Sequence, residues 1–130
     1  MIGLDTNVVI RYLTQDDPKQ TVITNELIEK KLSAQEPGYI TLITLVEITW
    51  VLESCYGQSK DSILDVIHSL LITKQLVIEQ ADLVYVAANN YCIGNADFSD
   101  SLITVLSKNN GCERVVTFDK KAVSVGMELL

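Results

Sequence analysis

The chain has 130 residues, of which 48% are hydrophobic and 21% are charged, a composition typical of a folded domain that excludes an intrinsically disordered chain. Ten Lys and Arg residues against 17 Asp and Glu residues give a net charge of −7 at pH 7. No strong basic patch, of the kind on which sequence-independent binding to nucleic acid depends, is visible in the sequence.

The cysteines and the apolar runs indicate the cellular environment of the chain. Its three cysteines are far apart and contain no Cys-x-x-Cys pair, and there is one histidine, which argues against a disulfide framework or a zinc site. No apolar run approaches the ~18 residues of a membrane helix, and a strand begins too close to Met1 to leave room for a signal peptide. We therefore expect a single cytoplasmic domain, residues 1–130, that does not enter a membrane.

The first seven residues predict a strand that turns into a helix. A short apolar run ends in Asp5-Thr6-Asn7, and a second apolar run, 8–13, follows directly. Asp, Thr and Asn side chains bond local backbone amides, so such a cluster is typical of a turn. Because ligands bind at the carboxyl ends of strands in open α/β sheets, Asp5 is either part of a site or a helix cap.

The remaining elements follow from caps, glycines and periodicity. Asp17, Pro18 and Gln20 form a strong helix start, while Thr44 and Ser59 are expected to begin two further helices. Strands are predicted at 1–4, 39–42, 76–78, 114–118 and 127–130, and helices at 8–13, 18–32, 44–55, 59–71, 83–91 and 102–106, with a polar loop at 95–100. This alternation predicts a three-layer α/β/α domain with a central, mainly parallel sheet of four or five strands.

Four acidic residues fall at or just after strand-to-helix junctions, which lie on one edge of a parallel sheet. They are Asp5, Glu47, Asp100 and Asp119, and Asp97 precedes Asp100 by one helical turn. Each also has a simpler explanation, because acidic side chains cap helices. In the first turn they also interact favourably with the helix dipole, by about 0.3–1 kcal/mol each.

Glu47 is the acid for which capping is the least satisfactory explanation. Thr44-x-x-Glu47 fits a capping box, and Asp97-x-x-Asp100 resembles one. However, Glu47 is flanked by Val46 and Ile48 on a helix expected to be largely buried. Buried carboxylates are rare unless they are paired or bind a metal, so this position favours a site.

Clustered carboxylates suit hard divalent cations, which prefer oxygen ligands. Such a cation relieves the repulsion between the acids, activates water and stabilises the oxygens of a phosphoryl displacement. The chain contains no Gly-x-Ser-x-Gly elbow, no phosphate-binding loop ending in Gly-Lys-Ser/Thr and no Gly-x-Gly-x-x-Gly motif.

Four segments together resemble the PIN-domain family, specifically its VapC toxin type. They are Leu4-Asp5-Thr6-Asn7, the segment 44–52 around Glu47, Asp97-Phe98-Ser99-Asp100-Ser101-Leu102-Ile103, and Val116-Thr117-Phe118-Asp119. The resemblance implies an endoribonuclease that uses Mg²⁺ or Mn²⁺. It implies a catalytic and metal-binding cluster of Asp5, Glu47, Asp100 and Asp119, with Asp97 as a further candidate ligand and Thr6, Asn7 and Thr117 as supporting residues.

The same resemblance implies an RNA substrate, a cognate antitoxin partner and a homodimer. Arg11, Lys120 and Lys121 lie near the motifs and are candidates for contacts with RNA phosphates, although each is equally well explained as a solvated surface charge.

Two alternatives to a ribonuclease remain open. An aspartate-based phosphatase also begins with a strand ending in Asp, but it requires a second Asp where this chain has Asn7, and a phosphoacceptor domain requires a Lys partner that is not evident here. The non-enzymatic alternative is a PIN-like binding module. The presence of all four acids argues against such a loss of activity.

Overall fold

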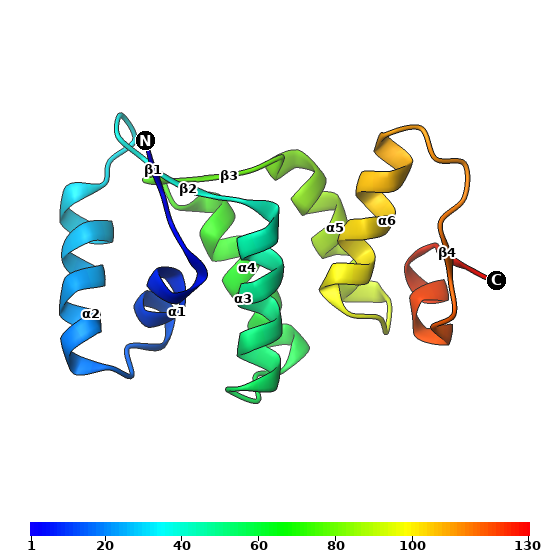
Figure 1. Cartoon of the computed structure of the whole chain (residues 1–130), viewed down its shortest axis with the longest axis horizontal. Helices are drawn as coiled ribbons and strands as arrows, with labels where there is room; N and C mark the ends of the chain where they lie inside the picture. Colours follow the sequence, from blue (N-terminus) through cyan, green and yellow to red (C-terminus); the bar gives the residue numbers. More distant parts are fainter.

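The computed structural model describes residues 1–130 and shows an α/β chain whose strands pair in parallel throughout (Figure 1). The strands are β1 (Ile2–Gly3), β2 (Gly38–Ile40), β3 (Leu76–Ile78), β4 (Val116–Thr117) and β5 (Glu128–Leu129). The helices are α1 (Thr6–Thr14), α2 (Pro18–Asn25), α3 (Leu42–Ser54), α4 (Lys60–Ile72), α5 (Ala81–Ile93) and α6 (Phe98–Asn109), with a π-helix η1 (Glu26–Lys31) and a 3-10 helix η2 (Lys120–Val125). No helix is long and apolar enough to cross a membrane.

The predicted α/β class and parallel pairing are confirmed, but the five strands are divided between two sheets. One has the order β1-β2-β3, and β4 pairs only with β5. The second pair is closed by hydrogen bonds from the backbone N–H of Glu128 to the Val115 carbonyl and from that of Leu130 to the Thr117 carbonyl, 2.8 and 2.9 Å. The free edge of β1 therefore has no neighbouring strand.

Alternation along the three-stranded sheet decides which face is covered. Leu4, Ile40 and Ile78 point to one face and are buried, whereas Tyr39 and Val77, which are paired in register, point to the other face and are half-buried and exposed. Helices α1, α3 and α4 lie on the same side of this sheet (Figure 1). The covering layer expected on the second face is not seen over this sheet.

The chain extends along one axis, with α1 and α2 toward one end and β4 and the C-terminus toward the other (Figure 1). A single cluster of 22 buried apolar residues runs through both halves. In the second half, α5 and α6 are joined by the buried Ser101 hydroxyl, which donates to the Ala87 carbonyl at 2.6 Å. Tyr91 and Phe98 also meet edge to face, with ring centroids 5.8 Å apart.

Local capping explains several helix starts. Asp17 accepts hydrogen bonds from the Lys19 and Gln20 backbone N–H groups, and Ser59 accepts one from Ser62, as expected. Helix α3 begins two residues earlier than predicted, because Thr41 is its N-cap and accepts from the Thr44 N–H at 3.1 Å.

The polar loop predicted at 95–100 is shorter than expected. Helix α6 already begins at Phe98, so Asp100 lies in its first turn instead of preceding the helix. Helix η2, which had no clear periodic signal, separates β4 from β5.

One buried hydroxyl offers a direct test of packing in α2. The Thr21 Oγ1 atom is buried without a hydrogen-bond partner, which costs free energy in the folded state. We expect Thr21→Val to raise the free energy of unfolding by about 1 kcal/mol, because valine keeps the shape and removes the unpaired group. Urea unfolding followed by circular dichroism measures the change.

The matched control is Thr24→Val on the same helix. The Thr24 hydroxyl donates to the Thr21 carbonyl at 3.1 Å, so its loss is expected to leave stability unchanged or to lower it. If both valine variants were destabilised equally, the Thr21 hydroxyl would have a partner in solution.

Candidate functional site

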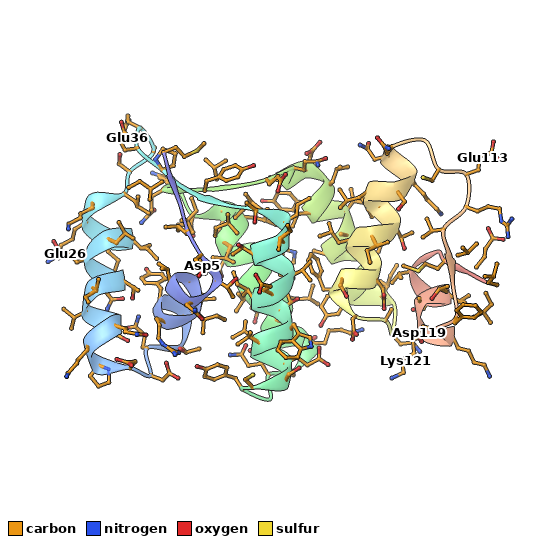
Figure 2. The ribbon with its side chains drawn as sticks, viewed as in Figure 1. Asp5, Glu26, Glu36, Glu113, Asp119 and Lys121 are labelled. Atoms are coloured by element: carbon orange, nitrogen blue, oxygen red, sulfur yellow. The ribbon has the colours of Figure 1, made fainter.

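Asp5 lies at the end of β1 and at the N-cap position of α1. Its backbone carbonyl accepts from the Val8 and Val9 N–H groups, at 3.1 and 3.3 Å, but its side chain makes no capping hydrogen bond. The carboxylate is exposed (Figure 2). Side-chain capping therefore does not account for this aspartate, and the group is free to bind a ligand.

The next residue connects the first helix to α3. Thr6 is buried, and its hydroxyl donates to the Glu47 Oε1 atom at 3.0 Å, which spans 41 residues of sequence. This bond fixes one oxygen of the Glu47 carboxylate beside the start of α1.

Glu47 is exposed, so the expectation that it lies on a buried helix face was wrong. Helix α3 buries Leu45, Ile48 and Leu52, and Glu47 points away from them. Because apolar residues flank Glu47 on both sides in the sequence, the pattern did not show which face of the helix it occupies. The capping-box explanation also fails, because Thr41 caps the helix and places Glu47 in its second turn.

Asp97, Asp100 and Asp119 form a second group of acids. Burial raises the pKa of Asp100, and the negative charges of Asp97 and then Asp119 raise it further. Asp97 is the N-cap residue of α6 but makes no side-chain capping bond. Asp97 and Asp119 therefore each lie close enough to Asp100 to repel its carboxylate.

Asp119 is held in a tight turn after β4. Its carboxylate accepts from the Lys121 backbone N–H, and its own N–H donates to the Thr117 hydroxyl, both at 2.9 Å. Thr117 thus shapes the turn that presents Asp119. Asp119 is the one acid of the set that caps a helix, the short η2.

One cavity brings an acid of α3 together with an acid of the C-terminal group. Glu47 and Asp97 line the same cavity of about 260 Å³ between α3 and the start of α6. Asp5 and Asp119 lie far apart along the long axis (Figure 2). No three His, Cys, Asp or Glu side chains come together closely enough to hold a metal ion. Since β4 does not adjoin β1, the strand ends that carry these two acids do not share a sheet edge.

Asn7 and Arg11 lie apart from Glu47. They line a separate cavity of about 210 Å³ between α1 and α2. The Arg11 guanidinium already makes hydrogen bonds within the protein. It donates to the Gln20 side chain at 2.7 Å and to the Tyr56 hydroxyl at 3.2 Å. The structure therefore favours a structural role for Arg11 over a contact with phosphate.

Some residues beside the acids carried no sequence motif. The Lys60 ammonium donates to the Gly94 carbonyl and lies 5.2 Å from the centre of the Tyr91 ring. Burial raises the pKa of Tyr91 to about 12, with smaller contributions from the charges of Glu53 and Asp97. Only the position of Lys60 directly after the Ser59 cap was readable from the sequence.

A comparison with protein-family models identifies the architecture that these elements belong to. The model described as PIN domain matches residues 2–126, and so includes every candidate acid. The chain belongs to the PIN-domain family. The family resemblance inferred from the four motifs is thereby confirmed.

A relative in the curated proteins points in the same direction. The chain is similar to a protein named VapC ribonuclease from Aquifex aeolicus (strain VF5), with 23% identity over 125 residues. The similarity covers 96% of this chain and 92% of that protein. No solved structure matches the chain.

The proximity of the three C-terminal acids has a measurable consequence. We expect Asp97→Asn to lower the pKa of Asp100 toward its ordinary value, because the substitution removes a nearby negative charge and asparagine still suits an N-cap. Carboxyl carbon shifts followed by NMR through a pH titration report this change.

Asp65→Asn, on the exposed face of α4, provides the control and is expected to leave the titration of Asp100 unchanged. An Asp100 pKa that did not respond to Asp97→Asn would mean that the two carboxylates are apart in solution.

Proposed function

We propose that this chain is a VapC-like endoribonuclease that hydrolyses RNA phosphodiester bonds with Mg²⁺ or Mn²⁺. The observation that carries the proposal is the match to the PIN domain over residues 2–126, which spans Asp5, Glu47, Asp100 and Asp119. The similarity to a protein named VapC ribonuclease over nearly the whole chain supports the choice of RNA as substrate.

The chemistry of the donor set suits the metal. All candidate ligands are carboxylates, the ligands that Mg²⁺ and Mn²⁺ prefer, and Mg²⁺ commonly takes only one or two of them directly. The repulsion around Asp100 also favours a bound cation. The motifs assign the cation to Asp5, Glu47, Asp100 and Asp119, with Asp97 as a further candidate, but in this structure Asp5 and Asp119 lie far apart and no three of these acids form a metal-binding group. When bound, the cation supplies positive charge that activates water and stabilises the leaving oxygen.

The protein's own groups orient the reacting partners. The Thr6 hydroxyl holds Glu47 Oε1, which leaves Oε2 free to accept a proton from an attacking water. Thr117 keeps the turn that presents Asp119. These contacts make Thr6 and Thr117 positioning residues, whereas Asn7 is exposed and is a candidate from the motif alone.

Partners and location form the remainder of the proposal. We infer a cognate antitoxin, a homodimer and a cytoplasmic setting. The three free cysteines, all exposed, fit a reducing compartment. Exposed apolar side chains such as Val22 and Ile23 on α2 offer surface for a protein partner.

A non-catalytic PIN-like binding module is the second candidate function. It is favoured by one observation, namely that no three acids come together as a metal-binding group. In this case the chain would bind RNA without cutting it.

Cleavage of cellular RNA by the purified protein separates the two. We expect discrete fragments with Mg²⁺ or Mn²⁺ and none with a chelator. Asp5→Asn should reduce the rate by about a hundredfold or more, because charge stabilisation by a metal is worth several kcal/mol and each ~1.4 kcal/mol is tenfold.

Asp65→Asn is the matched control, since it removes an exposed aspartate of α4 that belongs to none of the four motifs and should cut RNA normally. Identical fragments from wild type and Asp5→Asn would indicate a contaminating nuclease and would reject the proposed site. A folded, metal-binding protein that leaves RNA intact would establish the binding module instead.

The Thr6–Glu47 hydrogen bond predicts a smaller effect. We expect Thr6→Val to lower the cleavage rate by about 10- to 100-fold, since the loss of a group that orients a metal ligand or base has effects of this size. Thr6→Ser should restore most of the rate because it keeps the hydroxyl. Single-turnover cleavage, measured beside thermal unfolding, tests this, and equal rates for all three proteins would remove Thr6 from the site.

A further inference from the structure

The cavity shared by Glu47 and Asp97 has an exposed aromatic side chain on its wall. Five of its ten lining residues are hydrophobic. Trp50, one turn beyond Glu47 on α3, is 63% exposed and is the only tryptophan of the chain. The hydrophobic lining residues are Val46, Trp50, Val51, Tyr91 and Phe98, and the polar ones are Glu47, Thr49, Glu53, Asp97 and Ser99.

A second, more polar cavity adjoins the first and is lined by two lysines as well as two acidic residues. It has a volume of about 190 Å³ and shares Glu53, Tyr91 and Asp97 with its neighbour. It adds Lys60 and Lys121 to the walls. Lys121 lies close to Asp119 at the same end of the molecule (Figure 2). Because the Lys60 ammonium already donates to the Gly94 carbonyl, Lys121 is the cation available to a phosphate beside the indole surface.

We propose that the first cavity binds one unpaired base of an RNA strand, stacked on Trp50, with the lysine-lined cavity facing the phosphate of the same strand. This inference rests on the proposed function and assigns it a substrate subsite. Proteins that bind single-stranded RNA combine these two elements, an aromatic face for a base and cations for the backbone. In an acidic chain, stacking supplies affinity that long-range charge does not.

The cavity walls also predict which base fits. Glu53 and Asp97 are ionised carboxylates, which accept hydrogen bonds and donate none. Guanine presents an imino and an amino donor side by side on its Watson–Crick edge, so one carboxylate can accept both. Uracil presents a single N–H between two carbonyl oxygens, and a carboxylate repels both of these oxygens. The subsite therefore favours guanine over uracil.

Trp50 itself reports occupancy, because it is the only tryptophan. With a chelator present to prevent cleavage, we expect its fluorescence to be quenched by a uridine heptamer that carries one central guanosine. The all-uridine heptamer should bind more weakly, and a heptamer with an abasic central position more weakly still. The loss relative to the guanosine heptamer is expected to be about 5- to 150-fold for the abasic strand, the range seen when one base–aromatic stack is removed.

Variants measured by anisotropy of a labelled heptamer complete the test. Trp50→Ala should lose affinity over the same range, while Trp50→Phe, which keeps an aromatic face, should retain most of it. Ile43→Ala is the control, because Ile43 is another exposed apolar side chain of α3 and lies outside this cavity. Glu53→Gln should abolish the preference for guanosine. Lys121→Gln should weaken binding of all heptamers alike.

The failures of the two proposals are distinguishable. Quenching and Trp50-dependent binding without cleavage would reject the nuclease and keep the base subsite. Metal-dependent cleavage with no quenching, and with Trp50→Ala equal to Ile43→Ala, would overturn the subsite and keep the nuclease.

Discussion

The central strand β2 is the constraint on which the N-terminal half depends. It is hydrogen-bonded on both sides, with the Leu4 N–H donating to the Tyr39 carbonyl at 2.9 Å and the Glu79 N–H to the Ile40 carbonyl at 3.0 Å. Ile40 is fully buried beneath the helices. Gly38 begins the strand because a Cβ there would lie 2.8 Å from the Leu4 Cδ1 atom, too close for any larger residue without movement. Because β1 pairs with β2, Asp5 at the end of β1 has a fixed position relative to α3.

The second constraint is the distribution of charge, because the core is apolar and the candidate acids lie outside it. The core is held by apolar burial, in which each fully buried Ile or Leu side chain contributes about 1.5–3 kcal/mol. Three of the candidate acids contribute nothing comparable, because Asp5 and Asp97 make no side-chain capping bonds and Asp100 is partly buried and repelled by its neighbours. Carboxyl groups whose pKa is shifted in this way, such as Asp100, are typical of functional sites.

Local features were readable from the sequence because their causes are local. The caps at Asp17 and Ser59, the strand at 76–78 and the helix end at Gly94 each depend on a few adjacent residues, and all were predicted correctly. The motifs also predicted the four acids as a site, and this assignment stays a prediction. Their conformations as side chains, such as the free carboxylate of Asp5, depend on the neighbouring turn and required the structure.

Non-local pairing was not readable. Strands β1 and β4 each have two residues, so the sequence offers too few alternating positions to decide which neighbour they choose. The pairing of β4 with β5 removed the shared sheet edge on which the convergence of the acids had been inferred. The exposure of Glu47 was missed for a related reason, since apolar residues occupy both the buried and exposed faces of α3. The contact of Lys60 with Gly94 joins segments 34 residues apart and left no local signal.

The cavity between α3 and α6 links the two halves of the molecule chemically. Glu47, whose carboxylate accepts a hydrogen bond from Thr6, lines this cavity. Asp97, whose charge acts on Asp100 together with that of Asp119, lines it as well. A nucleotide in this cavity would therefore touch both groups of acids at once, although Asp5 and Asp119 lie far apart. Asp97 lies on the wall of the proposed base subsite, and its charge also acts on Asp100. A base bound there would therefore change the surroundings of Asp100, whose pKa is raised first by burial and then by the charges of Asp97 and Asp119.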